Sequence, residues 1–253
     1  MLNQINIQDI VTIAKEAGNA IMQIYKQDFE VEYKQDSSPL TLADKRANDI
    51  IEDGLNQLSV NFPILSEEGK ETPYEDRKDW EYYWLVDPLD GTKEFVKKND
   101  EFTVNIALIH KDTPVLGVVY APALDICYWA KQGEGAFKDE RKLPLKTESQ
   151  RNTYKIVSSR SHMSDETQAF IDAIDTQKEK ELISIASSLK ICLVAEGEAD
   201  IYPRLGPTME WDTGAAHAVV NESGGQLNDQ KNNNVLKYNT SEKLLNNYFV
   251  VKK

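Results

Sequence analysis

The sequence predicts an α+β protein in two parts: an amino-terminal part with helices and a meander sheet, and a smaller α/β part. Apolar residues recur at helical spacing near the amino terminus, β-branched and aromatic runs fill residues 102–130, and strand and helix patterns alternate after residue 153. A chain of 253 residues with 40% apolar content can bury one large core or two modest ones. The polar stretch 146–153 predicts a boundary between residues 1–150 and 151–253.

The first part opens with two expected amphipathic helices. Helical spacing predicts the first helix from Ile10, Ala14, Ala17, Ile21 and Ile24, and a short extended piece at 31–33 follows. The inward face of the second helix is expected to comprise Ala47, Ile50, Ile51, Leu55 and Leu58. A strand over 82–86 should end at Asp87-Pro88, and residues 102–109, 115–120 and 126–129 should form an antiparallel meander with a turn at 133–135.

The second part is expected to alternate strands with helices. We predict strands at 155–158, 183–185 and 200–202, and helices at 165–174, 188–196 and 212–222. Gly197 and Gly224-Gly225 are expected to end the last two helices. Residues 229–239 are polar and rich in asparagine, which predicts a surface loop.

Composition excludes several classes of partner. The net charge of −13 argues against a nucleic-acid polymer, because its binders need a basic face. No apolar run is long enough for a membrane span, and residues 1–25 lack a signal-peptide pattern. Cys127 and Cys192 lie in apolar surroundings, so we expect buried reduced thiols and a cytoplasmic protein. An anionic substrate would then need local cations, helix amino termini or bound metal.

The strongest local signal is the segment 87–92, which reads DPLDGT at the expected end of a strand. Asp87, the Leu89 carbonyl and Asp90 would offer several hard oxygen ligands of the kind that Mg²⁺ takes. Gly91 permits close backbone approach, and Thr92 would begin a helical turn whose N–H groups could face a phosphate. The alternative is an Asx-Pro turn in which Asp90 caps a short helix, and this segment alone leaves both interpretations open.

Three further acidic positions favour the metal interpretation, and each has a structural alternative. Glu67 follows a short apolar run, and it or Glu68 could instead belong to a solvated acidic loop. Asp212 could be a helix-start acid favoured by the helix dipole. Asp44 lies three residues after Thr41, which matches a capping box, and it could also orient or deprotonate a water through Thr92.

Four segments together resemble the inositol monophosphatase superfamily of lithium-sensitive magnesium phosphatases. They occur in that family's order and spacing at 38–44 (SPLTLAD), 66–68 (SEE), 87–92 (DPLDGT) and 211–215 (WDTGA). Within the superfamily the chain is most similar to the CysQ-type 3′(2′),5′-bisphosphate nucleotidases. That similarity lies at 84–95 (WLVDPLDGTKEF), 101–108 (EFTVNIAL), 117–122 (GVVYAP), 158–162 (SSRSH), 187–190 (SSLK), 194–197 (VAEG) and 202–207 (YPRLGP). One departure is Glu210, an acid beside Asp212 that bears on the local electrostatics near the substrate.

The resemblance implies a layered αβαβα sandwich and a set of site roles. Two or three Mg²⁺ ions would be held by Glu67, Asp87, Asp90, Asp212 and the Leu89 carbonyl. Asp44 with Thr92 would activate a metal-held water for in-line attack on phosphorus. The nucleotide would contact Glu67, Leu89, Asp90, Gly91, Thr92, Ser159, His162, Lys190, Arg204 and Asp212, although without the resemblance His162 and Lys190 would be taken as ordinary loop and surface residues.

The implied reaction is hydrolysis of the 3′-phosphate of 3′-phosphoadenosine 5′-phosphate (PAP), and of its sulfated form if accepted, which supports sulfate assimilation. Lithium inhibition is also implied. One alternative is an inositol monophosphatase or sugar bisphosphatase with the same metal site. Another is a non-catalytic metal-dependent binding protein, which the joint presence of Asp44 and Thr92 disfavours. The oligomeric state stays open, and the chain has no basic amphipathic helix of the kind that would hold it at the inner face of a membrane.

Overall fold

The structure of the chain is a computed structural model that describes residues 1–26, 31–33, 39–146, 152–158 and 164–253. The helices in these ranges are α1 (Ile7–Tyr25), α2 (Leu42–Asn56), α3 (Tyr74–Arg77), α4 (Thr92–Val96), α5 (Asp165–Asp172), α6 (Leu189–Glu196) and α7 (Gly214–Glu222), with 3₁₀ turns η1 (Leu2–Gln4) and η3 (Glu210–Asp212). None of these helices is both long and apolar enough to cross a bilayer.

The strands form a small hairpin and two larger sheets. The hairpin pairs β1 (Val31–Tyr33) with β2 (Pro39–Thr41). The seven-stranded sheet runs in the order β3 (Ile64–Ser66), β4 (Tyr82–Asp90), β5 (Thr103–His110), β6 (Thr113–Ala121), β7 (Ile126–Lys131), β8 (Gly135–Lys138) and β9 (Arg141–Lys142). The five-stranded sheet runs in the order β11 (Glu179–Ser184), β10 (Thr153–Ser158), β12 (Ile201–Arg204), β14 (Phe249–Lys252) and β13 (Gln226–Asp229).

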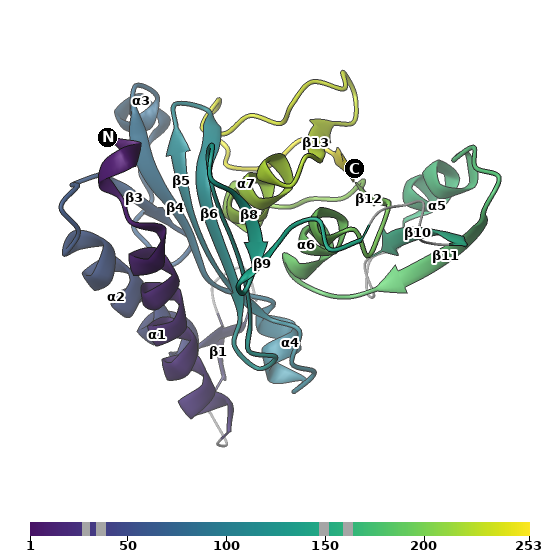
Figure 1. Cartoon of the computed structure of the whole chain (residues 1–253). Coiled ribbons are helices and arrows are strands. Elements are labelled where there is room, and N and C mark those ends of the chain that lie inside the picture. Colours follow the sequence, from purple (N-terminus) through teal and green to yellow (C-terminus); the bar gives the residue numbers. More distant parts are fainter. Residues whose placement is uncertain (27–30, 34–38, 147–151, 159–163) are drawn as a thin grey trace.

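The layers follow the predicted αβαβα order (Figure 1). Helices α1 and α2 cover one face of the seven-stranded sheet, and α6 and α7 lie between the two sheets. Helix α5 packs against the five-stranded sheet through the small apolar cluster of Ile156, Ile171 and Ile201. The predicted meander is confirmed, because every pair from β4 to β9 is antiparallel.

The middle helical layer joins the two parts in one core. A single apolar cluster contains Leu85 and Ala107 of the large sheet together with Val194, Val219 and Val251. Helix α7 lies so close to β6 that a Cβ at Gly117 would stand 2.1 Å from the Ala215 carbonyl oxygen. A side chain at residue 117 would therefore push this helix off the sheet.

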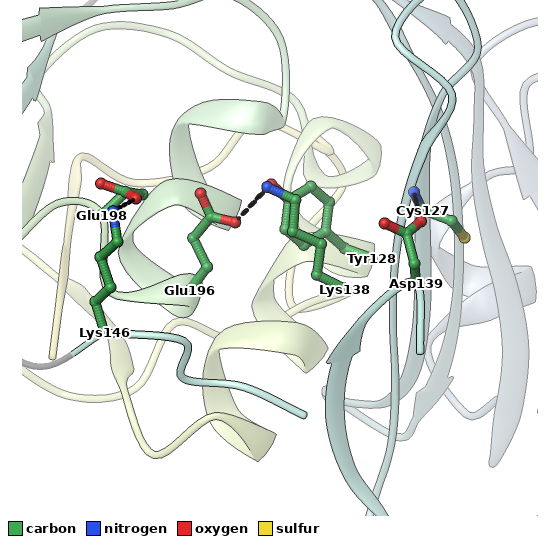
Figure 2. Close-up of polar contacts among 7 residues, drawn as sticks. All are labelled: Cys127, Tyr128, Lys138, Asp139, Lys146, Glu196 and Glu198. Carbon is green, nitrogen blue, oxygen red and sulfur yellow. Dashed lines mark hydrogen bonds and ion pairs between the residues drawn. The ribbon is translucent and has the colours of Figure 1, made fainter. Parts of the chain in front are cut away.

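A buried ion pair also spans the layers (Figure 2). The Lys138 ammonium lies 2.7 Å from Glu196 Oε2, and the Tyr128 hydroxyl donates to the same oxygen at 3.0 Å. Lys138 and Tyr128 belong to strands of the large sheet, whereas Glu196 ends α6. Both thiols, Cys127 and Cys192, are buried and free, as the sequence predicted.

Two boundaries differ from the sequence predictions. Strand β4 continues past Asp87-Pro88 to Asp90, with a register shift against β5 between Asp87 and Asp90. The irregularity accommodates Pro88, which has no N–H to give to a ladder. Asp212 ends the turn η3, and α7 begins only at Gly214, so Asp212 is not the first residue of that helix.

Candidate active site

The acidic residues gather where β3 and β4 end. These strands are parallel, with Ser66 opposite Val86, and the Glu67 N–H donates to the Val86 carbonyl at 3.1 Å. Glu67 therefore follows the sheet edge beside Asp87. Asp44 is buried in the first turn of α2, a helix that packs on β4.

The segment after Val86 forms a tight turn that presents several oxygens. The Leu89 N–H donates to Asp87 Oδ1 at 3.1 Å, and the Thr92 hydroxyl lies 3.4 Å from the Leu89 carbonyl oxygen that it faces. Gly91 has φ +96, and a Cβ there would lie 3.2 Å from the Glu101 carbonyl oxygen. The Asx turn of the structural alternative is present, since Asp87 accepts the Leu89 N–H. Its second half is wrong, because the capping position before α4 is held by Gly91 and not by Asp90.

Asp90 and Asp212 meet through a serine of the middle layer. Ser188 donates its backbone N–H to Asp90 Oδ2 at 2.7 Å, and its hydroxyl lies 2.9 Å from the same oxygen. The Ser188 hydroxyl also lies 2.6 Å from the carbonyl oxygen of Asp212. The Asp212 carboxylate is held separately, by the Met209 N–H at 2.9 Å. One residue therefore links a carboxylate of the large sheet to the turn that carries Asp212.

The neighbouring acids raise the pKa of Asp87 and of Asp212. Burial raises the pKa of the Asp87 carboxyl well above its usual range, and Glu67, Asp90, Asp212 and Asp44 raise it further in that order. The pKa of Asp212 is also raised, first by burial and next by Asp90, while the Met209 N–H opposes the shift. A cation would relieve this repulsion.

The acidic cluster offers the oxygen atoms that a hard divalent cation prefers as ligands, although it does not surround a metal ion by itself. Within the described ranges, no three carboxylate, imidazole or thiol groups converge tightly enough to hold a metal ion by themselves. Every donor in the cluster is an oxygen, and Mg²⁺ typically takes only one or two carboxylates from a protein and completes its shell with waters and substrate phosphate. The residues present therefore fit Mg²⁺ and leave room for a phosphate.

A pocket of about 150 Å³ adjoins the carboxylates. Its lining includes the acids Asp90 and Asp212 together with the basic residues Lys93, Lys190 and Arg204. Burial lowers the pKa of Lys190, and the Asp90 charge counteracts this. The Arg204 guanidinium donates to the Pro207 carbonyl at 2.8 Å. Cationic side chains beside a cluster of acids suit a ligand that is anionic at more than one point.

The predicted residues Ser159 and His162 lie outside the described residues. Glu210 is not among the residues that line this pocket; it is buried, and its carboxylate belongs to a polar network. The Asn239 N–H donates to both oxygens of its carboxylate, at 3.0 and 2.8 Å. Burial raises the pKa of Glu210 to about 7, against the effect of the Asn239 N–H and of Arg77. The expected effect of Glu210 on the electrostatics near the substrate is therefore not supported by a direct contact of its carboxylate with the pocket.

Sequence reasoning missed Ser188 and Asn105. The Asn105 amide donates to the Ser188 hydroxyl at 2.9 Å, and Asn105 is paired with Asp87 across the sheet. Both residues lie in segments that carried the family resemblance, EFTVNIAL and SSLK. A serine just before a helix is ordinarily interpreted as its cap, so the pattern gave no reason to place Ser188 against Asp90.

The comparisons with known proteins define the class. The model of the inositol monophosphatase family matches residues 3–251, so the chain belongs to that family.

The chain is 46% identical over 250 residues to the 3′(2′),5′-bisphosphate nucleotidase CysQ of Salmonella typhimurium, covering 97% of this chain and 98% of that protein. It is 45% identical to the CysQ of Escherichia coli strain K12 with the same coverage. A crystal structure of CysQ from Bacteroides thetaiotaomicron, described as a bacterial member of the inositol monophosphatase family, superimposes with a TM-score of 0.88 at 43% identity. That match covers 98% of this chain and 97% of the other.

Proposed function

We propose that this chain is a 3′(2′),5′-bisphosphate nucleotidase that hydrolyses PAP to AMP and phosphate. The observation that carries the proposal is that one pocket is lined both by the acids Asp90 and Asp212 and by the basic residues Lys190 and Arg204. A nucleoside bisphosphate has one phosphate to place near the carboxylates and a second to place near the basic residues. The enzyme would recycle PAP during sulfate assimilation, in a cytoplasm that keeps Cys127 and Cys192 reduced.

The cofactor proposed is Mg²⁺, as two or three ions. Glu67, Asp87, Asp90, Asp212 and the Leu89 carbonyl are the groups that would hold it. When bound, Mg²⁺ supplies positive charge to the phosphate oxygens and makes a water more acidic. Lithium inhibition is expected at the same site.

The residues of the chain then position the reaction. Asp44, buried at the start of α2, would accept the proton of the attacking water, with Thr92 orienting that water. The water oxygen forms a bond to phosphorus as the bond from phosphorus to the ribose 3′-oxygen breaks, and that oxygen takes up a proton from solvent water to leave as the 3′-hydroxyl of AMP. Turn 87–92 holds its acids in place through the Asp87–Leu89 hydrogen bond, so little reorganisation is needed in the transition state.

Substrate selection is assigned to the smaller part of the protein. Lys190 and Arg204 would bind the nucleotide together with Ser159 and His162. Lys190 is suited to a phosphate, because burial makes its charge costly and a further anion beside it would add to the compensation that Asp90 provides. Inositol 1-phosphate has no second phosphate to supply that anion.

The test is phosphate release from PAP and from inositol 1-phosphate, measured side by side with Mg²⁺ and with a chelator. We expect Mg²⁺-dependent release from PAP and at least about 100-fold lower kcat/KM for inositol 1-phosphate, as the loss of one charged contact predicts. The opposite preference would point to an inositol monophosphatase with the same metal site. No release from either compound would point to a non-catalytic binding protein.

A further inference from the structure

Ser188 occupies the capping position of α6 but does not cap the helix. It is the residue immediately before Leu189, and its side chain makes no capping hydrogen bond. Serine at this position usually accepts an N–H from the first turn of its own helix. The Ser188 side chain, 3% exposed, instead contacts the large sheet and the η3 turn. Its hydroxyl is therefore committed to the site and not to the helix.

The hydroxyl has one proton and two acceptors. Oγ lies 2.6 Å from the Asp212 carbonyl oxygen and 2.9 Å from Asp90 Oδ2, while the Asn105 amide donates to Oγ at 2.9 Å. The backbone N–H of Ser188 is the constant donor to Asp90 Oδ2, at 2.7 Å. The hydroxyl also joins this oxygen to the Asp212 carbonyl, so it is the group through which the start of α6 positions both acids at once.

The same short segment carries a nucleotide contact. Lys190 follows two residues after Ser188 in α6, and Ser188, Lys190 and Asp90 all line the pocket. A ligand that moves or fixes Lys190 would therefore also fix the start of α6. Through the Ser188 hydroxyl, the relative position of Asp90 and Asp212 would be fixed with it, and the affinity of the carboxylates for a cation would change.

We propose that Ser188 is a positioning residue that couples nucleotide occupancy of the Lys190 side of the pocket to cation affinity at Asp90 and Asp212. The inference rests on the proposed function, because it takes Lys190 as a nucleotide contact and the acids as cation ligands. Coupling of this kind is reciprocal, so AMP should tighten cation binding by the same factor by which the cation tightens AMP binding.

The test is titration with Mn²⁺, whose free form is measured by electron paramagnetic resonance, with and without AMP and without turnover. In the wild-type protein AMP should lower the Mn²⁺ dissociation constant about fivefold or more. In Ser188→Ala, which keeps the backbone N–H and loses the hydroxyl, AMP should change it less than about twofold. Ser188→Thr, which keeps the hydroxyl, should recover most of the coupling.

Ser223→Ala is the matched control. Ser223 is also buried, at 7% exposure, and donates its hydroxyl to the Val220 carbonyl at the end of α7, so this variant should keep the wild-type coupling. Equal coupling in Ser188→Ala and wild type, or no coupling in the wild type, would overturn the proposal. Phosphate release from PAP by the same wild-type preparation separates the two failures: release without coupling refutes the role of Ser188 alone, whereas no release refutes the proposed function.

Discussion

Arg77 is buried, 1% exposed, at the end of α3, and its guanidinium is committed to the chain around it. It donates to the carbonyl oxygens of Thr72, Ser241 and Glu242 at 3.1, 3.0 and 2.7 Å, and to the side-chain oxygen of Asn239. Asn239 in turn donates its backbone N–H to Glu210. Two buried charged groups are thus joined through one asparagine, and the turn with Asp212 begins at Glu210.

Replacing Arg77 by Met should strongly destabilise the fold. Methionine fills a similar volume, so the main loss is the hydrogen bonds that the guanidinium donates to three carbonyl groups and to Asn239. Losing a buried, charged donor with four acceptors costs about 3–5 kcal/mol in unfolding free energy. For a chain of this size that corresponds to a fall in Tm of about 6–20 °C.

The assay is thermal unfolding followed by circular dichroism at pH 7, with Arg141→Met as the control. Arg141 is exposed in β9, so its replacement should shift Tm by less than about 2 °C. Glu210 has a pKa of about 7 with Arg77 beside it and should take up a proton when Arg77 is lost, so adding Glu210→Gln to Arg77→Met should change the Tm little. A Tm for Arg77→Met within about 2 °C of the wild type would refute this reasoning.

Two further predictions concern buried polar groups away from the site. Lys138→Met should lower the unfolding free energy measured in urea by about 3 kcal/mol, because Glu196, whose side chain is 3% exposed, loses its cation. Phosphate release should persist in this variant. An unchanged unfolding free energy would contradict this prediction. Burial lowers the pKa of His217 from 6.5 to about 3, so the unfolded chain takes up the proton first and stability falls as the pH drops below about 6.5. This residue alone should cost about 1.6 kcal/mol between pH 6.5 and 5, and His217→Asn should flatten the pH dependence of the unfolding free energy by that amount. An equally steep dependence in the variant would contradict the assignment.

Much of the fold could be predicted from local patterns. The strands from Thr103 to Lys131 are rich in β-branched and aromatic residues and are separated by turn residues, so existence, order and pairing followed from the sequence. The end of β4 could not be predicted, because Pro88 ordinarily ends a strand and here sits in a register shift that the neighbouring strand tolerates. The pairing of β4 with β5 therefore outweighed the local tendency of Pro88 to end the strand.

The site was predictable only where its motifs are local. Asp87, Asp90 and Thr92 lie in one turn, so their association was evident from the sequence. The role of Glu210 could not be predicted from the sequence, because its network includes Arg77 and Asn239, which are 162 positions apart in the chain. A side chain whose partners come from distant segments gives no periodic or spacing signal.

Asp44 also lies far along the chain from Thr92, the residue with which it is expected to activate water. This role of Asp44 is central to the proposed phosphatase mechanism. Asp44→Asn keeps the size of this buried side chain and removes its ability to take a proton, whereas Asp49→Asn alters an exposed acid on the same helix and serves as the control.

The decisive measurement is Mg²⁺-dependent phosphate release from PAP by Asp44→Asn, with Mn²⁺ affinity measured in parallel. We expect kcat to fall by about a thousandfold while Mn²⁺ affinity stays within about threefold of the wild type, and Asp49→Asn to retain full activity. Full activity in Asp44→Asn would contradict the assigned mechanism.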